Sequence, residues 1–302
     1  YMKLLEINGG KKLTGTIRVS GAKNSAVALI PAAILSDEEV TICNVPDITD
    51  TEALCEILSF LGARVKRASE TIVIDSKEIE NKEIPATLAK KLRASYYFMG
   101  ALLGKYKKVT MSLPGGCSIG ARPINLHLKG FEALGAKVTN KDNCYIVEAD
   151  ELKGNNIYLD FASVGATINI MLAAVKAKGK TIIDNAAKEP EIVNVATLLN
   201  NMGAKIRGAG TSSIEIEGVD YLGKCFHEVI PDRIEAGTYV ILGAAVGENL
   251  KVDNIIPEHI ESLTSKLEEM GAFLDIGSDY IIVSRQDNYK SIHVKTQTYP
   301  GF

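Results

Sequence analysis

The chemically most promising feature of this sequence is a cysteine in a glycine-rich segment, followed by an arginine. Cys117 follows Gly115 and Gly116 and precedes Gly120, and Arg122 comes five residues after it. Glycines allow a backbone to move and expose a side chain, and a nearby guanidinium lowers the pKa of a thiol, so that more of it is thiolate. We therefore predict that Cys117 is a reactive thiol in a mobile loop, with Arg122 as its cationic neighbour.

The cysteine-dependent phosphatases offer a competing interpretation of this segment. They place a cysteine and an arginine at the two ends of a C-x5-R phosphate loop, usually with a histidine before the cysteine. Here the spacing from Cys117 to Arg122 is C-x4-R, and Gly116 precedes the cysteine. Both departures count against a phosphatase. A surface loop with an incidental cysteine is the other alternative, and the sequence leaves it open.

A second cation stands close to a predicted helix start. Lys23 lies in the segment Ser20-Gly21-Ala22-Lys23-Asn24, just before an apolar helix predicted from Ala26. The N-terminus of a helix already carries a partial positive charge, so a lysine there is favourable when an anion binds between the two. An exposed lysine without a ligand is the alternative. The spacing of a nucleotide-binding P-loop is absent.

Three further residues stand at equivalent helix starts. Arg93 precedes an apolar helix, where an unpaired charge is costly, so we expect it to meet a carboxylate of the protein or of a ligand. Ser163 and Asp232 are suitable N-caps, and the amides that follow Ser163 are equally suited to a phosphate. If the helices converge, their starts form an anion-attracting cleft together with Lys23 and Arg122.

An internal repeat of about 70 residues positions these helix starts. A three-residue motif of Leu or Met, then Gly, then Ala occurs four times. Each copy ends a helical pattern and precedes a strand-like alternation. Glycine suits this place because it adopts the left-handed conformation that ends helices. Upstream of each motif lie an apolar run of small residues and a short strand. The glycines, 73, 68 and 68 residues apart, are Gly62, Gly135, Gly203 and Gly271.

The repeat predicts a unit of strand, buried helix, strand, outer helix and strand. Because small residues allow helices to approach closely, we expect several units to pack around one axis, with the small-residue helices inside and the sheets outside. The second copy of the repeat has the longest connection between its strand and its Gly-containing motif, and the extra residues lie around Cys117. Since loops often carry function, the longer connection favours a functional role for this cysteine.

Composition and charge exclude several other classes of protein. A chain of 302 residues allows two domains, and a net charge of −3 predicts neither nucleic acid nor a membrane as a partner. We find no apolar run long enough for a transmembrane helix and no signal-peptide layout. The five cysteines are scattered, which argues against disulfides and a zinc site, and the four histidines do not cluster. We therefore expect a cytoplasmic setting, no metal and no cofactor.

Five stretches of the chain closely resemble the enolpyruvyl transferases that act on UDP-N-acetylglucosamine. The resemblance extends over essentially the whole chain, and its most specific part is the cysteine loop. It implies an α/β fold, a two-domain inside-out α/β barrel with three repeats in each domain. Residues 22–230 would form a complete three-repeat domain, and residues 1–21 with 231–302 an incomplete second domain. The five stretches are residues 20–24, 113–123, 163–167, 189–193 and 231–235.

The resemblance also implies the reaction. Such a transferase moves the enolpyruvyl group of phosphoenolpyruvate to the 3'-hydroxyl of UDP-N-acetylglucosamine and releases phosphate, without a metal, as the first committed step of peptidoglycan synthesis. Cys117 would protonate the methylene carbon of phosphoenolpyruvate or add covalently to the phosphoenolpyruvate molecule, and would be the thiol that fosfomycin alkylates. The implied catalytic residues are Cys117, Lys23 and Arg122. The implied substrate-binding residues are Lys23, Asn24, Arg93, Arg122, Pro123, Ile124, Asn125, Leu126, Phe161, Ala162, Ser163, Val164 and Asp232.

The sequence departs from the family pattern at two places. Asn125 stands where many relatives carry an aspartate, so we expect no carboxylate role at that position. The chain ends at Phe302, ahead of the Pro-Thr-Asp segment that carries the proposed general base of the family. We therefore expect negligible transferase activity from the 302-residue chain alone.

Two other functions compete with this interpretation. The first is an enzyme like 5-enolpyruvylshikimate-3-phosphate synthase, which shares the fold and the chemistry but has no equivalent of the loop around Cys117. The second is a non-catalytic protein that binds a nucleotide sugar, and the presence of Cys117, Lys23 and Arg122 argues against it.

Overall fold

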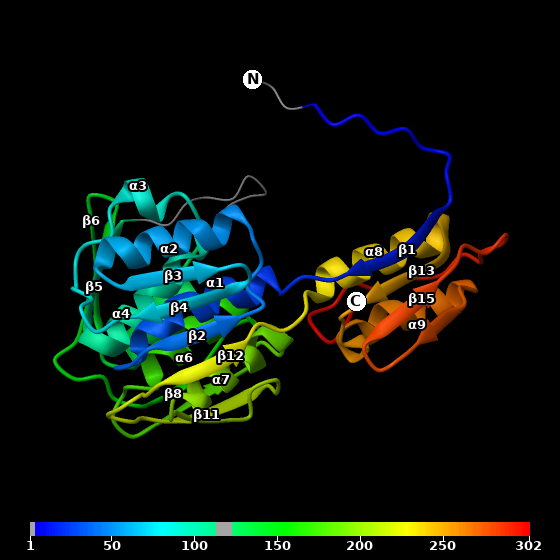
Figure 1. Ribbon diagram of the computed structural model, residues 1–302. Helices are drawn as coiled ribbons and strands as arrows, with labels where there is room; N and C mark the ends of the chain where they lie inside the picture. The colour runs from blue at the N-terminus through cyan, green and yellow to red at the C-terminus, as the bar shows by residue number, and fades with distance from the viewer. Residues whose placement is uncertain (1–3, 113–122) are drawn as a thin grey trace. The chain divides into compact units, whose positions relative to one another are not determined.

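The computed structural model describes residues 4–112 and 123–302, and the chain divides into two compact units. The large unit is Gly21–Ile230, and the small unit combines Tyr1–Ser20 with Pro231–Phe302. Each unit has a hydrophobic core of its own. In Figure 1 the large unit runs from blue through green to yellow, and the small unit combines the blue strand β1 with the yellow to red end of the chain.

Within the described part of the large unit, three successive groups of helices and strands follow the repeat. The first group holds α1 (Lys23–Ala32), the 3₁₀ turn η1 (Ala33–Leu35), β2 (Val40–Cys43), α2 (Thr49–Leu61), β3 (Arg64–Ala68) and β4 (Thr71–Asp75). The second holds α3 (Ala86–Ala89), the 3₁₀ turn η2 (Arg93–Tyr96), α4 (Tyr97–Tyr106), β5 (Lys108–Ser112), α5 (Asn125–Ala133), β6 (Lys137–Lys141) and β7 (Cys144–Glu148). The third holds β8 (Asn156–Tyr158), α6 (Val164–Ala174), β9 (Lys180–Asp184), α7 (Pro190–Asn201), β10 (Lys205–Arg207), β11 (Ser213–Glu217) and β12 (Cys225–Glu228).

The small unit repeats the same pattern once. Its members are β1 (Leu13–Arg18), α8 (Arg233–Val246), β13 (Gly247–Asp253), the 3₁₀ turn η3 (Pro257–Ile260), α9 (Glu261–Met270), β14 (Leu274–Ile276) and β15 (Tyr280–Val283). None of the helices in the described ranges combines the length and the apolar character that a membrane span requires.

The four sheets of the described residues share one topology. Their strand orders are β12-β2-β4-β3, β8-β9-β11-β10, β1-β13-β15-β14 and β5-β7-β6. In the first three, the leading strand pairs parallel with the second strand, and the remaining pairs are antiparallel. In the fourth, an isolated parallel bridge from Ile84 to Met111 takes the place of the leading strand. The internal repeat predicted from the sequence is therefore a structural repeat.

The glycines of the repeated motif adopt the predicted left-handed conformation. Gly62, Gly135, Gly203 and Gly271 have φ angles of 101°, 94°, 111° and 103°, all in the left-handed region. The predicted strands on either side of the outer helices are also present. The last strand of each repeat, which forms a hairpin with the strand after the glycine, was not part of the predicted repeat. The described sheets are open, and no closed barrel is present among them.

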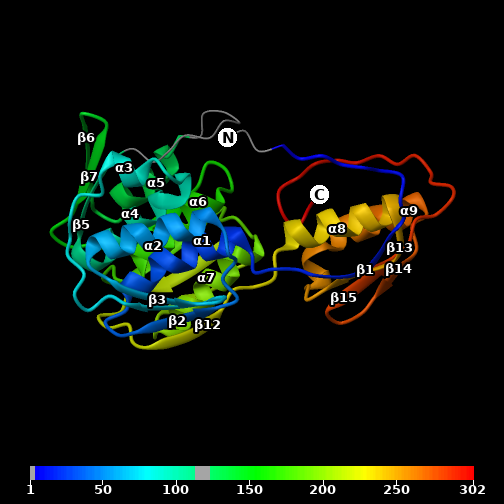
Figure 2. The same cartoon turned by 45° about the horizontal axis from the view of Figure 1, so that its top comes forward.

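The small-residue helices occupy the interior of the large unit, as the repeat predicts. Helices α1, α4 and α6 are buried along nearly their whole length, whereas α2 and α7 alternate buried and exposed positions. Helix α4 packs against both α1 and α6. Figure 2 shows these helices beside the sheets that form the outer layer. This packing brings equivalent ends of the inner helices together.

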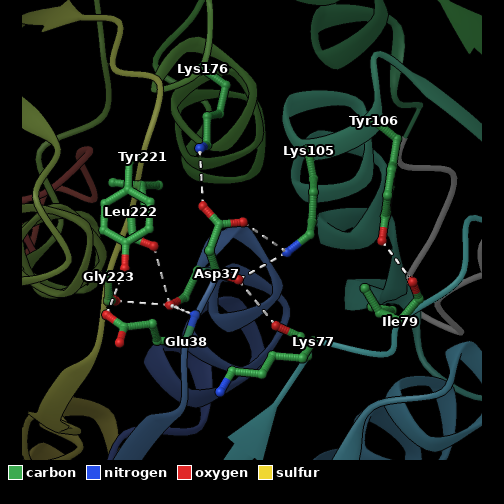
Figure 3. Close-up of polar contacts among 12 residues, drawn as sticks. Asp37, Glu38, Lys77, Ile79, Lys105, Tyr106, Lys176, Tyr221, Leu222 and Gly223 are labelled. Atoms are coloured by element: carbon green, nitrogen blue, oxygen red, sulfur yellow. Dashed lines mark hydrogen bonds and ion pairs between the residues drawn. The ribbon is translucent and has the colours of Figure 1, made fainter.

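A polar cluster joins the C-terminal ends of the inner helices (Figure 3). The carboxylate of Asp37 lies 3.8 Å from Nζ of Lys105 and 3.9 Å from Nζ of Lys176. Lys105 also donates to the carbonyl of Ser36 at 2.9 Å, and Lys176 to that of Asp220 at 2.7 Å. Burial lowers the pKa of both lysines. Because the C-termini meet here, the N-termini of α4 and α6 meet at the other end of the unit.

Candidate ligand site at the helix starts of the large unit

The predicted site residues fall into three groups by location. Cys117 and Arg122 lie outside the described residues, so the reactive thiol and its cationic neighbour stay a prediction. Asp232 belongs to the small unit, where its side chain accepts hydrogen bonds from the amides of Ile234 and Glu235 at 2.8 and 3.0 Å. The structure therefore confirms Asp232 as a helix cap. The other predicted residues lie in the large unit.

Lys23 and Asn24 begin helix α1, three residues before the start that the sequence predicted. Both residues are exposed. Nζ of Lys23 lies 2.5 Å from Oδ2 of Asp50, which belongs to the first turn of α2. A carboxylate of the protein thus faces the lysine that the sequence predicted to face an anion. Asp50 was not singled out by the sequence, since an acidic residue in the first turn of a helix is commonplace.

Arg93 opens the turn η2 that leads directly into α4. The structure thereby confirms its predicted place at the start of a buried helix. Its guanidinium carbon lies 5.7 Å from the centre of the Tyr96 ring, close enough for a cation–π contact. The aromatic ring helps to hold the charged group at this end of α4.

The segment before and within the first turn of α5 alternates between buried and exposed residues. Ile124 and Leu126 are buried, whereas Pro123 and Asn125 are exposed. The two apolar side chains anchor the segment in the core of the large unit. Pro123 and the carboxamide of Asn125 are thereby presented to solvent at the start of the helix.

The start of α6 is capped as the sequence predicted. Oγ of Ser163 accepts a hydrogen bond from the amide of Ala166 at 3.2 Å, which is the N-cap geometry. Phe161 leaves 60% of its surface exposed, and Ala162 and Val164 are half-buried. An exposed aromatic ring therefore lies next to a helix N-terminus.

Tyr96 brings three of the predicted segments together. Its ring packs edge-on against His127 of α5, with the ring centres 4.6 Å apart, and lies against the guanidinium of Arg93. A methyl group placed on Gly165, in the first turn of α6, would lie 2.7 Å from the Tyr96 hydroxyl and 3.1 Å from Nε2 of His127. The starts of α4, α5 and α6 therefore converge on one place.

Asn169 ties these three helices together and was not predicted from the sequence. Its side chain is fully buried in α6 and accepts a hydrogen bond from the amide of Gly100 in α4 at 2.8 Å. It also lies 3.0 Å from the carbonyl oxygen of Tyr96 and 3.0 Å from Nδ1 of His127. An asparagine within an otherwise apolar helix was the available signal, because a buried amide needs partners.

His127 is the second residue of this site that was not predicted from the sequence. Only 4% of its surface is exposed, and burial, followed by the nearby charge of Arg93, lowers the pKa of the imidazole to about 3. The ring is therefore neutral at physiological pH. Its sequence signal was weak, since a single histidine on a helix usually packs in the core without a further role.

The four cysteines of the described residues are free thiols in strands or helices, namely Cys43, Cys55, Cys144 and Cys225. Burial is the main cause that raises the pKa of three of them, Cys55, Cys144 and Cys225, which disfavours the thiolate. Across residues 4–112 and 123–302, no three His, Cys, Asp or Glu side chains are grouped to hold a metal ion.

Comparison with known proteins gives a consistent result. The model of the family EPSP synthase (3-phosphoshikimate 1-carboxyvinyltransferase) matches residues 7–302. The chain is 58% identical over 298 residues to UDP-N-acetylglucosamine 1-carboxyvinyltransferase 2 of Listeria monocytogenes, covering 99% of this chain and 70% of that protein. It is 58% identical over 302 residues to the protein of the same name from Bacillus anthracis, again covering 70% of that protein.

Two solved structures share the fold. The enolpyruvyl transferase NikO from Streptomyces tendae superposes with a TM-score of 0.83 at 25% identity, covering 93% of this chain and 68% of that one. EPSP synthase from Acinetobacter baumannii superposes with a TM-score of 0.71 at 20% identity, covering 94% of this chain and 67% of that one. At that lower identity the likeness concerns the fold alone.

Proposed function

The chain belongs to the EPSP synthase family of enolpyruvyl transferases, and we propose that it uses the chemistry of that family on a nucleotide sugar. The reaction transfers the enolpyruvyl group of phosphoenolpyruvate to the 3'-hydroxyl of UDP-N-acetylglucosamine and releases phosphate. It is the first committed step of peptidoglycan synthesis.

One observation carries this proposal. The chain is 58% identical, over nearly its full length, to proteins named for carboxyvinyl transfer to UDP-N-acetylglucosamine. The corresponding likeness to EPSP synthase is 20% and supports the fold only. The nucleotide sugar is therefore favoured over a shikimate as the acceptor.

The proposed chemistry assigns roles to the Cys117 thiol and to two cations, Lys23 and Arg122. Protonation of the methylene carbon of phosphoenolpyruvate leaves positive character on the neighbouring carbon, which the sugar hydroxyl then attacks while giving up its proton to a base. Loss of a proton from the new methyl group together with phosphate then restores the double bond of the transferred enolpyruvyl group. Cys117 supplies the proton to the methylene carbon, or its sulfur adds to the neighbouring carbon. Lys23 and Arg122 bind the carboxylate and phosphate, whose charge fixed cations stabilise through the transition state. The ion pair with Asp50 holds the Lys23 ammonium at the start of α1 before substrate binds.

The nucleotide sugar is proposed to bind where α4, α5 and α6 begin. Arg93 offers a cation there, and the amides behind Ser163 offer the partial positive charge of a helix N-terminus. Asn24 and Phe161 complete the proposed surface of the large unit, together with Ala162, Val164 and the segment Pro123, Ile124, Asn125 and Leu126. Asp232, in the small unit, is proposed as a substrate-binding residue on the family resemblance alone. Exposure of Asn24, Pro123, Asn125 and Phe161 supports these roles, since an exposed side chain can meet a ligand.

We further propose that both units are parts of inside-out α/β barrels. The large unit would be the complete three-repeat domain that carries the cysteine loop. The small unit would contribute one repeat to a second domain, with its leading strand β1 taken from the start of the chain. The shared sheet topology of the two units supports this arrangement.

Intact-mass spectrometry after fosfomycin treatment, in parallel with calorimetry using UDP-N-acetylglucosamine, tests the proposed function. We expect the nucleotide sugar to bind and a single adduct to form, to be lost in Cys117→Ser and to persist in Cys144→Ser. Cys144 is a suitable control because it is the half-buried thiol of strand β7. Binding without an adduct would favour a non-catalytic nucleotide-sugar-binding protein. A chain that shows no binding and forms no adduct would contradict the proposal.

A further inference from the structure

The orientation of the Asn169 carboxamide follows from two backbone groups. The amide of Gly100 can only donate, so the side-chain atom 2.8 Å from it is the oxygen. The carbonyl of Tyr96 can only accept, so the side-chain atom 3.0 Å from it is the nitrogen. The carboxamide of Asn169 is therefore fixed in one orientation, with its NH₂ group toward α5.

This orientation decides which nitrogen of His127 carries the proton. The NH₂ group of Asn169 lies 3.0 Å from Nδ1 of His127 and must donate to it. A nitrogen that accepts a hydrogen bond is unprotonated, and a neutral imidazole keeps its one proton on the other nitrogen. His127 is therefore the Nε2–H tautomer, and Nε2 is a hydrogen-bond donor.

The Nε2 atom lies at the start of α6. A methyl group built on Gly165 would lie 3.1 Å from Nε2 and 3.0 Å from Cε1, so the imidazole directly borders the first turn of that helix. Within the described residues, the bond at Nδ1 is the one hydrogen bond of this ring. The side chain as a whole is more than nine-tenths buried, but Nε2 is not among the fully buried atoms of the described residues that lack a partner, so this donor borders open space and can meet a ligand.

The surroundings of Nε2 favour an anionic acceptor. Helix α6 has eleven residues and directs its positive N-terminal dipole at this place. The guanidinium carbon of Arg93 lies 5.7 Å from the centre of the Tyr96 ring, and its charge acts on His127. A neutral N–H donor adds a directional hydrogen bond to these charges, and a phosphate oxygen fits all three groups.

We propose that His127 is a recognition residue of the nucleotide-sugar site, donating from Nε2 to a diphosphate oxygen at the start of α6. Asn169 is its positioning residue, because it selects the tautomer that makes the donation. Gly165 is required for the approach, because any side chain there would narrow the space beside Nε2. This inference rests on the proposed function, which supplies the diphosphate.

A second histidine of the large unit provides a matched control. His227 is also buried, at 6% exposure, and Asn194 lies 2.8 Å from it, but at Nε2 rather than Nδ1. The amide of Ile230 and the carbonyl of Glu228 fix the Asn194 carboxamide in the same way. Nε2 of His227 therefore accepts, which places the proton of the neutral ring on Nδ1, and the side-chain amide of Asn201, 3.5 Å from Nδ1, must turn its oxygen toward that proton. His227 thus has the opposite, Nδ1–H tautomer, and it lies on strand β12.

Nitrogen-15 NMR of the imidazoles in the full 302-residue chain tests the proposal directly. We expect the Nε2–H tautomer for His127 and the Nδ1–H tautomer for His227 at neutral pH. Saturating UDP or UDP-N-acetylglucosamine should shift the Nε2–H signal of His127, whereas uridine and phosphoenolpyruvate should leave it in place. The signals of His227 should not respond to any of these compounds.

Three results would overturn the inference. A proton on Nδ1 of His127, or an imidazolium at neutral pH, would refute the assignment of the donor. In the second result, UDP-N-acetylglucosamine shifts the amide signals of Val164 and Ala166 without shifting the Nε2–H signal of His127, or phosphoenolpyruvate shifts that Nε2–H signal as well. Either outcome would refute the role of His127 and leave the proposed function intact. If no signal of the chain responds to UDP-N-acetylglucosamine, the proposed function fails and this inference fails with it.

Variants provide an independent measurement by calorimetry with UDP. His127→Phe removes the donor but keeps a ring, and we expect about a tenfold or greater loss of affinity, the effect of one hydrogen bond to a charged group. Gly165→Ala should weaken binding while the tautomer of His127 stays unchanged, which covers the case of a poorly folded His127→Phe. His227→Phe should leave the affinity within about twofold of wild type. Equal losses in both histidine variants would contradict the proposal.

Discussion

Acidification should destabilise the large unit through its buried histidines well before its carboxylates are protonated. His127 has a pKa lowered to about 3 by burial, against an ordinary value of 6.5. The unfolded chain therefore binds a proton in a range where the folded chain does not. Such a group contributes stability that is present above pH 6.5 and is lost as the pH falls toward 3.

The magnitude follows from linkage. Between about pH 7.5 and about pH 4.5, the unfolded histidine becomes almost fully protonated while the folded one stays neutral, which removes about 2.7 kcal/mol from the free energy of unfolding. Burial lowers the pKa of His227 as well, so its contribution has the same sign. The pKa values of Glu38 and Glu215 are lowered from 4.5 and that of Asp75 from 3.8, so these carboxylates lose their contribution to stability only at or below the acid end of this range.

Native-state hydrogen exchange, followed by mass spectrometry on peptides from α6, measures this loss within the large unit. Exchange rates corrected for the intrinsic effect of pH give the free energy of opening at each pH. His127→Phe should flatten the dependence on pH by about 1.4 kcal/mol per unit between about pH 6 and about pH 4.5. An unchanged slope in this variant would refute the assignment of a buried, neutral His127, whatever the absolute stability of the variant.

Three further substitutions test other parts of the structure. Asp37→Asn leaves two largely buried lysines without their carboxylate and should cost about 2–4 kcal/mol by urea denaturation, whereas Glu148→Gln, which breaks an exposed ion pair, should cost under about 1 kcal/mol. Ser163→Ala removes the cap of α6 and should cost about 1 kcal/mol in the same assay, with Ser163→Asp restoring most of it. Gly100→Ala places a methyl group 2.2 Å from the Asn169 side-chain oxygen and should abolish the Nε2–H tautomer signal of His127; retention of that signal would contradict the network.

Sequence periodicity alone determined the repeat and the class of fold. The recurring glycine after each helix, the small-residue helices and the strands around them all have short-range causes, namely the left-handed conformation of glycine and the close packing of small side chains. The caps Ser163 and Asp232 were predictable for the same reason, because capping involves residues only two or three positions apart. The family resemblance rested on equally local stretches of sequence.

Only the tertiary structure decided which polar groups meet. Asn169, Tyr96 and His127 lie on three helices separated by dozens of residues, and no local pattern predicts that one carboxamide bridges them. The pairing of Lys23 with Asp50 and of Asp37 with two lysines likewise depends on how helices pack. The protonation state of His127 is harder still to predict from the sequence, because it depends on burial and on the orientation of a neighbouring side-chain amide. Long-range packing creates both conditions, and a linear sequence does not display them.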